Sequence, residues 1–203
     1  LWVMLREVVL MRKFNRGDTL VEVLLGVTMF SLVAVIALET MNRGMAIAQY
    51  SLETTLVRQQ VDAQAEMLRY AHDMKNDTWK KLVDNNSVSV SAVNDNEGNL
   101  GAEKCPDDFS AKEFALAATP SLASKISILN NPGDYKAAET YARVDSDTKK
   151  TYGISVRLVK PSTTVGSRDS NKYDAYIKAC WMPVGSKMPA TIGTIVRLYD
   201  SGL

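Results

Sequence analysis

Few side chains in this sequence have the type and spacing needed for covalent or metal chemistry. His72 is the only histidine, and it stands beside Asp73 near the end of a predicted helix, where histidine more often caps or faces solvent than catalyses. Cys105 and Cys180 are the only cysteines and do not have CxxC spacing. No nucleophile motif, metal cluster or glycine-rich phosphate loop accompanies them. We therefore expect neither an enzyme nor a bound metal or cofactor.

An apolar segment near the amino terminus, residues 20–38, is long enough to cross a membrane. As a helix rising ~1.5 Å per residue it spans roughly 28 Å, about the thickness of a bilayer core. A signal peptide has a shorter apolar region and a small-residue cleavage site, whereas residues 39–43 read ETMNR. Arg12, Lys13 and Arg16 precede the segment, which predicts a cytoplasmic amino terminus and an extracytoplasmic remainder.

One carboxylate, Glu22, interrupts this segment close to its start. A carboxylate costs on the order of 2–3 kcal/mol at the bilayer centre and less near the interface, so such residues usually have a partner. From the charge alone, Glu22 can be read as lying in the headgroup region of an ordinary single-pass anchor. The residues around it favour a second interpretation.

Residues 16–25, RGDTLVEVLL, resemble the processing site of the type IV pilin family, pseudopilins included. In that family a membrane peptidase cuts after the glycine, and a glutamate near the new terminus pairs with the terminal amine of a neighbouring subunit. The resemblance implies that Gly17 ends the leader, that Asp18 is the first mature residue, and that Glu22 is the assembly glutamate. Paired in a bundle of low dielectric constant, amine and carboxylate would each remove the other's desolvation penalty.

The match extends to Thr19 and Leu20, whereas Asp18 departs from the usual phenylalanine. The resemblance implies that cleavage tolerates this change, but the departure weakens the case for the customary amino-terminal methylation. Residues 1–17 are interpreted as the leader, with residues 1–10 as an upstream extension, because Met11 is a natural start.

The resemblance further implies four partners: a prepilin peptidase, other pilin subunits, a pilus assembly platform and the membrane. The precursor would be a single-pass membrane protein, and the assembled subunit would belong to an extracellular filament, a surface fimbrium or a secretion pseudopilus. Major pilins commonly carry a proline in the helical stem, and here none occurs before Pro106. That absence favours a minor pilin or a pseudopilin.

Apolar and small residues continue at steps of three and four beyond the apolar segment and predict one stripe on a helix. Gly26 and Gly44 are the positions where this helix is expected to be least stable. The stripe is expected to pack on the chain's own globular part. We predict a nearly continuous helix over residues 20–73, with 18–44 as the transmembrane and assembly part and 45–75 as the amphipathic part. The stripe comprises Ile47, Tyr50, Thr54, Val57, Val61, Ala65, Leu68 and Ala71, and the other faces carry Glu53, Arg58, Gln59, Asp62, Glu66 and Arg69.

Residues 76–203 are enough for one modest globular domain. Alternation predicts strands over residues 152–159, 173–182 and 191–199, with a connection at 183–189 and a turn at 130–133. We also expect helix at 79–83, a short strand at 88–93 and a short helix over 110–116 begun by a serine cap. The predicted fold class is α+β: a long amino-terminal helix packed on a carboxy-terminal antiparallel sheet, which the pilin resemblance also implies.

The two cysteines lie in the part expected outside the cytoplasm, where disulfide bonds persist. We predict a bond between Cys105 and Cys180, which would stabilise the fold by about 4 kcal/mol in the chain-entropy model. The alternative is two buried free thiols.

Charge is unevenly distributed along the globular part. Residues 73–148 carry 13 acidic and 8 basic residues, net −5, whereas residues 149–203 carry 3 acidic and 9 basic, net +6. A cationic face could attract DNA, an anionic cell surface or the acidic half of a neighbouring subunit, although no aromatic residues interleave in a stacking pattern. The plain alternative is solvated strand faces with pairing inside the chain. The candidate cationic residues are Arg157, Lys160, Lys172, Lys178 and Arg197.

Two other function classes therefore stay open beside the filament subunit. One is a permanently anchored surface adhesin or receptor, which predicts an uncleaved amino terminus. The other is a DNA-binding minor pilin of an uptake system, which predicts salt-dependent DNA binding by the globular part.

Overall fold

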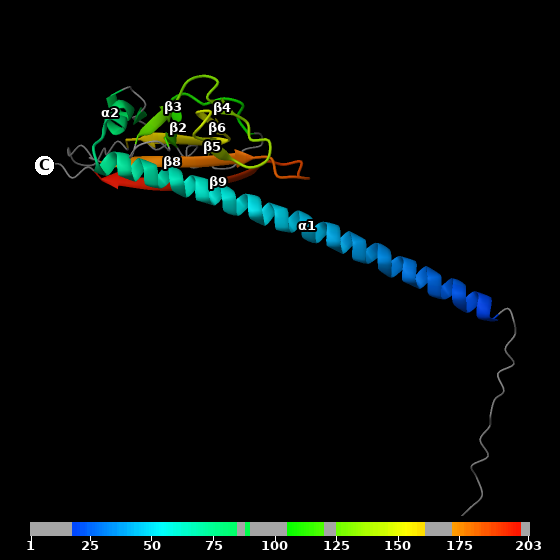
Figure 1. Ribbon diagram of the computed structural model, residues 1–203. Helices are drawn as coiled ribbons and strands as arrows, with labels where there is room; N and C mark the ends of the chain where they lie inside the picture. Colours follow the sequence, from blue (N-terminus) through cyan, green and yellow to red (C-terminus); the bar gives the residue numbers. More distant parts are fainter. Residues whose placement is uncertain (1–17, 85–87, 90–104, 120–124, 161–171, 200–203) are drawn as a thin grey trace, which may run out of the picture. The chain divides into compact units, whose positions relative to one another are not determined.

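The computed structural model describes residues 18–84, 88–89, 105–119, 125–160 and 172–199 (Figure 1). By its internal contacts the chain divides into two compact units, Leu1–Met45 and Ala46–Leu203. The first unit contains only helix among its described residues, whereas the second contains the rest of that helix, a short helix and all the described strands.

The predicted long helix is confirmed as α1, Asp18–Asp73, which has 56 residues and continues through both Gly26 and Gly44. It ends where Lys75 adopts a left-handed backbone with φ of 43° and Asn76 N–H donates to the Ala71 carbonyl.

The helix expected at residues 79–83 is confirmed within α2, Asp77–Asp84, which is a separate helix. The Asn76 side chain caps its start, because Asn76 Oδ1 accepts the Trp79 N–H at 2.9 Å.

The strands of the described residues form a six-stranded and a three-stranded sheet. In the larger sheet β7 pairs in parallel with β1 and antiparallel with β2 and β8, and the path continues to β3 on one side and β9 on the other. Its strands are β1 Val88–Ser89, β2 Glu113–Ala118, β3 Ile126–Leu129, β7 Ile154–Val159, β8 Lys172–Trp181 and β9 Ala190–Tyr199. The smaller sheet has the order β4-β6-β5, with β4 Tyr135–Lys136, β5 Arg143–Asp145 and β6 Lys150–Tyr152.

The α+β fold class is confirmed, since α1 packs on a carboxy-terminal sheet whose long strands β7, β8 and β9 are antiparallel. The three late strands were therefore predicted correctly, as was the turn near residue 131, where Asp134 N–H donates to the Asn131 carbonyl at 3.0 Å. The strand expected at 88–93 is described only at its first two residues.

The short helix expected over residues 110–116 is wrong, because these residues form a turn followed by β2. The signals that suggested a helix start are used in the turn: Ser110 N–H donates to the Glu113 carboxylate, and Glu113 N–H donates to the Ser110 carbonyl. Lys112 then has φ of 67°, which no right-handed helix contains. Pairing with β3 and β7 outweighs the helix propensity of the alanines and the leucine that follow.

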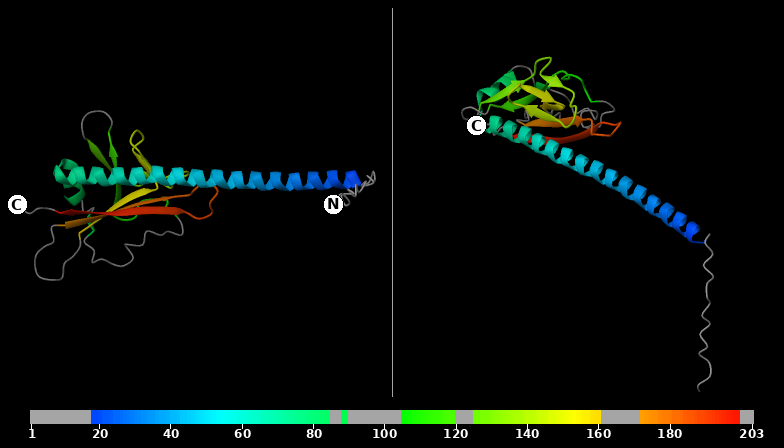
Figure 2. Two further views of the ribbon diagram at one scale, coloured as in Figure 1. Left: turned by 90° about the horizontal axis from the view of Figure 1, so that it is seen from below. Right: turned by 45° about the vertical axis from the view of Figure 1, so that its right-hand side comes forward.

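The main core lies between α1 and the larger sheet, and Figure 2 shows the second half of α1 lying along β8 and β9 from two further directions. The predicted stripe is buried from Val57 onward, whereas Ile47 and Tyr50 remain 70% and 50% exposed. A smaller cluster on the other face of β2 holds Ala115, Ala117 and Leu129 against partly buried Phe109 and Val144. The main cluster includes Val57, Val61, Ala65, Leu68 and Ala71 of α1 and Ile154, Val156, Leu158, Ala175, Ile177 and Trp181 of the sheet.

Candidate functional site

The apolar part of α1 is exposed along its whole length. Each large apolar side chain of residues 20–38 is more than half exposed, from 54% at Ile36 to 76% at Phe30. The most apolar window of the helix has a mean hydropathy of 2.4 and contains no buried residue. α1 is therefore long and apolar enough to span a membrane.

The hydroxyl groups of this part of α1 are satisfied by the helix itself. Thr28 Oγ1 donates to the Leu25 carbonyl at 2.9 Å, and Ser31 Oγ donates to the Val27 carbonyl at 2.8 Å. Such bonds remove the cost of placing a hydroxyl in hydrocarbon. Glu22 is the remaining polar side chain of residues 20–38, and it takes part in none of the ion pairs between described residues. A carboxylate only accepts hydrogen bonds when ionised, so helical carbonyls cannot satisfy it.

The residues of the candidate processing site stand at the start of this helix. Thr19, Leu20 and Glu22 lie in its first two turns, because α1 begins at Asp18. Residues 18 and 22 are four apart and so lie on one side of the helix. Gly17 and the leader, residues 1–17, lie outside the described residues. Cleavage after Gly17 therefore stays a prediction.

The second half of α1 is bound to the globular part by buried and half-buried polar side chains that sequence reasoning missed. Gln64 donates from Nε2 to the Leu116 carbonyl at 2.7 Å and accepts the Leu116 N–H on Oε1 at 2.8 Å. Gln60 Oε1 accepts the Val144 N–H at 3.2 Å. Their spacing of four residues along one helix face was the available signal, although amides at that spacing are also common on solvated faces.

Glu53 belongs to the faces of α1 predicted to lie outside the apolar stripe, yet the structure buries it. Its side chain is buried, with 8% exposed, and accepts the Trp181 Nε1–H at 3.2 Å and the Val184 N–H at 3.5 Å. These bonds join α1 to the end of β8 and to the connection that follows it. The sequence signal was Glu53's place one residue before Thr54 of the apolar stripe, which is too weak to distinguish burial from exposure.

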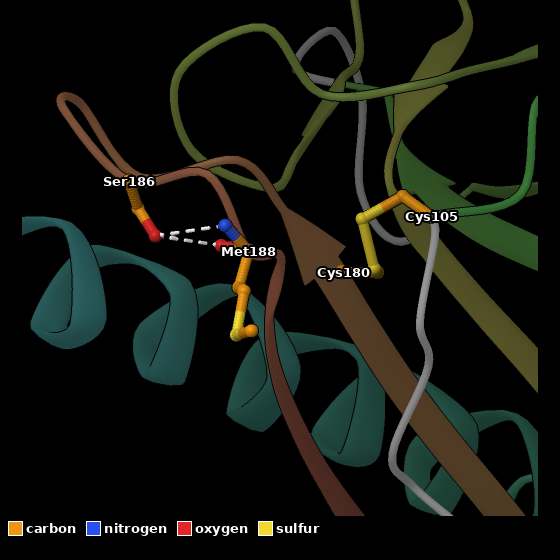
Figure 3. Close-up of a disulfide and its surroundings, with 4 residues drawn as sticks. All are labelled: Cys105, Cys180, Ser186 and Met188. Carbon is orange, nitrogen blue, oxygen red and sulfur yellow. Dashed lines mark hydrogen bonds between the residues drawn. A yellow bond between two sulfur atoms is a disulfide. The ribbon is translucent and has the colours of Figure 1, made fainter.

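The predicted disulfide bond is confirmed between Cys105 and Cys180. Figure 3 shows it beside the connection between β8 and β9, which carries Ser186 and Met188. Ser186 Oγ donates to the Met188 carbonyl at 2.8 Å and accepts the Met188 N–H at 3.1 Å. The disulfide bond ties the segment before β2 to β8, the strand that leads into this connection.

The five candidate cationic residues do not share one surface. Arg157, Lys172, Lys178 and Arg197 occupy strand positions that alternate with core residues, so they lie on the sheet face opposite α1. Lys160 stands apart, because its ammonium lies 5.9 Å from the ring centroid of Tyr173, a core residue.

The charge of one of these residues is offset by a carboxylate. Arg197 binds Asp174 with two bonds of 2.6 and 2.8 Å, and that contact raises the pKa of the arginine above its ordinary value. The cationic surface is therefore smaller than the sequence suggested.

His72 is buried, which differs from the expectation that it caps the helix or faces solvent. Its ring meets Trp79 edge-on at 4.8 Å between centroids, and its Nδ1 lies 3.0 Å from Asp73 Oδ1. Trp79 in turn meets Tyr173 at 5.3 Å. The histidine thus belongs to an aromatic cluster that joins α1 to α2 and β8.

Comparison with family models, with curated proteins and with solved structures finds no match to this chain.

Proposed function

We propose that this protein is a structural subunit, a minor pilin or a pseudopilin, of a type IV pilus-like filament. The observation that carries the proposal is Glu22: it is the one polar side chain of the exposed apolar part of α1 that does not bond to its own helix. It ends a Thr-Leu-Val-Glu sequence that follows basic residues, Gly17 and Asp18, which is the arrangement that resembles the pilin processing site. The α+β fold with a long amino-terminal helix supports the same proposal.

The proposed mechanism has two steps. A membrane peptidase first cuts after Gly17 and leaves a terminal amine on Asp18. The mature subunit then leaves the lipid and joins a bundle in which Glu22 accepts that amine from a neighbouring copy. Moving an apolar helix from lipid to bundle gains little hydrophobic free energy, because both surroundings are apolar. Packing and the charge pair must therefore favour the correct register, since a misplaced subunit would leave both charges unpaired.

The carboxylate is tested by Glu22→Ala and Glu22→Gln. We expect normal membrane insertion and normal leader removal, but filament incorporation reduced at least about ten-fold, as loss of roughly 1.4 kcal/mol or more from each contact would give. Incorporation is measured by immunoblotting of sheared filaments against total membrane content. Glu39→Ala is the matched control, because Glu39 is exposed on the same helix and pairs with Arg43 of its own chain. Equal filament content in Glu22→Ala and the parent would refute the assembly role.

The cut site is tested by Gly17→Ala. The variant should keep its leader, because the proposed peptidase recognises the glycine before the scissile bond. Intact-mass spectrometry of membrane extracts should find an amino terminus at Asp18 in the parent and not in the variant. A mature parent protein that retains residues 1–17 would refute processing and would favour a permanently anchored adhesin or receptor.

A further inference from the structure

The apolar stripe of α1 is longer than the globular part that covers it. In the second unit Val57 and Val61 are buried, but Ile47 and Tyr50, which continue the same stripe toward the amino terminus, are 70% and 50% exposed. No described element covers them. An amphipathic helix gains stability only from the part of its stripe that leaves water, so this exposed part indicates a further contact.

The connection between β8 and β9 adds apolar side chains beside the same turn of α1. Met182, Val184 and Met188 are 40%, 59% and 77% exposed. Glu53 accepts the Val184 N–H, and Glu53 follows Tyr50 by three residues, so the connection lies next to the side of α1 that carries Tyr50.

The connection is held in a defined shape by its own hydrogen bonds. Ser186 bonds twice to Met188, as Figure 3 shows, and Ser186 N–H donates to the Pro183 carbonyl at 3.0 Å. Its exposed side chains are therefore presented in a fixed arrangement. We call Ile47, Tyr50, Met182, Val184 and Met188 the apolar patch.

The chemistry of the patch suits the surface of a lipid bilayer. Residues 182–189 contain Lys187 and no acidic residue, and the nearby carboxylate of Glu53 is buried. Valine and methionine can enter the boundary between headgroups and acyl chains, where tyrosine is also favoured, while lysine meets anionic headgroups.

The chain also tethers the patch to the apolar segment. Exposed apolar residues continue along α1 through Met41 and Met45 to Ile47. Ile47 is the sixth residue after Met41, so even a fully extended chain would place Ile47 within about 22 Å of Met41. A membrane crossed by residues 20–38 is therefore tethered to the patch by the chain itself, whereas a second copy would have to be recruited.

We propose that the apolar patch docks the globular part on the lipid surface while the protein is anchored in the membrane. The inference rests on the membrane anchoring contained in the proposed function and is independent of filament assembly. The connection between β8 and β9 then acts as a second membrane contact in addition to the spanning helix. Glu53 is its positioning residue, because it holds the connection against α1.

The test uses the full chain in vesicles of phosphatidylcholine and phosphatidylglycerol, with and without acyl chains carrying bromine, a contact quencher of tryptophan. Val184→Trp reports the patch. Tyr199→Trp is the matched control, since Tyr199 is 66% exposed at the opposite end of β9. Phe30→Trp reports the spanning segment, and the parent's emission is subtracted throughout.

We expect brominated lipid to lower the added emission about two-fold or more at Val184→Trp and Phe30→Trp, because both would reach the acyl boundary. Emission of Tyr199→Trp should not change. Quenching at Phe30→Trp without quenching at Val184→Trp would overturn the docking inference and leave anchoring intact. A blue shift of Val184→Trp without quenching would mean that another copy covers the patch, and would overturn it too. No quenching at Phe30→Trp would refute the anchor, and the docking inference with it.

Discussion

The side chain of Gln64 makes the hydrogen bonds to β2 that a neighbouring strand would otherwise make. β2 pairs with β7 only through Glu113 and Phe114, so the next backbone groups on that edge need other partners. Gln64, 1% exposed, supplies both a donor and an acceptor to Leu116. One helical amide thus satisfies two buried backbone groups, which would otherwise each cost about 1–3 kcal/mol.

Gln64→Ala should therefore lower the free energy of unfolding by at least about 2 kcal/mol. Gln64→Glu should also destabilise, because a carboxylate accepts the Leu116 N–H but cannot donate to the Leu116 carbonyl. Gln59→Ala is the control, since Gln59 is exposed on the same helix, and it should change stability by less than about 0.5 kcal/mol. The measurement is urea unfolding of the detergent-solubilised chain followed by tryptophan fluorescence. Equal midpoints for Gln64→Ala and Gln59→Ala would contradict the role.

Individual polar residues were the least predictable part of the sequence. The stripe Val57, Val61 and Leu68 could be predicted because apolar spacing alone specifies it. The burial of Glu53 and Gln64 could not, because it depends on where the pairing of β2 with β7 stops and on where β8 ends beside α1, which no local pattern encodes. The reverse holds for Glu22, whose apolar neighbours made its exceptional position visible in the sequence.

At the scale of elements, the close approach of β7 to the disulfide-bonded residue Cys180 of β8 depends on one glycine. Gly153 has φ of 71°, and its carbonyl accepts the Cys180 N–H at 2.8 Å. A Cβ at this position would lie 2.1 Å from the Cys180 carbonyl oxygen and 3.0 Å from Ala138 Cβ. Neither neighbour can move freely, because one is strand backbone and the other is buried.

Gly153→Ala should thus lower the free energy of unfolding by at least about 3 kcal/mol, because the costs of backbone strain and of overpacking are added together. Gly133→Ala is the matched control, because Gly133 also has positive φ, 91°, but a Cβ there meets nothing within 4 Å. That control should lose only about 1–2 kcal/mol from strain. Thermal unfolding with the disulfide intact compares the two variants. If Gly153→Ala were as stable as Gly133→Ala, β7 and β8 could move apart at Cys180, and the close contact at Gly153 would not be required.

Elements with strong periodicity were predicted, and elements defined by distant partners were not. α1 and the strands β7, β8 and β9 follow from apolar spacing over ten or more residues or from clear alternation. Residues 113–118, EFALAA, have good local helix propensity, yet they become β2 because β3 and β7 provide backbone partners on either side. The disulfide could be predicted from the cysteine count and the expected compartment, whereas its position beside the β8–β9 connection could not.

At the scale of the whole molecule, stability and the proposed assembly reside in different units. All the buried apolar residues of the described chain, from Val57 to Leu198, lie in the second unit, and the first unit contributes none. Glu22 and the exposed apolar segment lie in the first. A change in the first unit can therefore alter membrane insertion or assembly without altering the fold of the second.

This division predicts that residues 46–203 fold without the rest of the chain. Expressed in an oxidising compartment, this fragment should form the Cys105–Cys180 bond and unfold in one cooperative transition, with a free energy within about 1 kcal/mol of the full chain, because no core contact is removed. Urea unfolding of fragment and full chain in the same detergent makes the comparison. The Cys105→Ala/Cys180→Ala variant of the fragment should lose about 4 kcal/mol, since the bond closes a loop of 75 residues. A fragment that binds hydrophobic dyes and lacks near-ultraviolet circular dichroism would mean that the first unit contributes to the core, and would contradict the separation of roles.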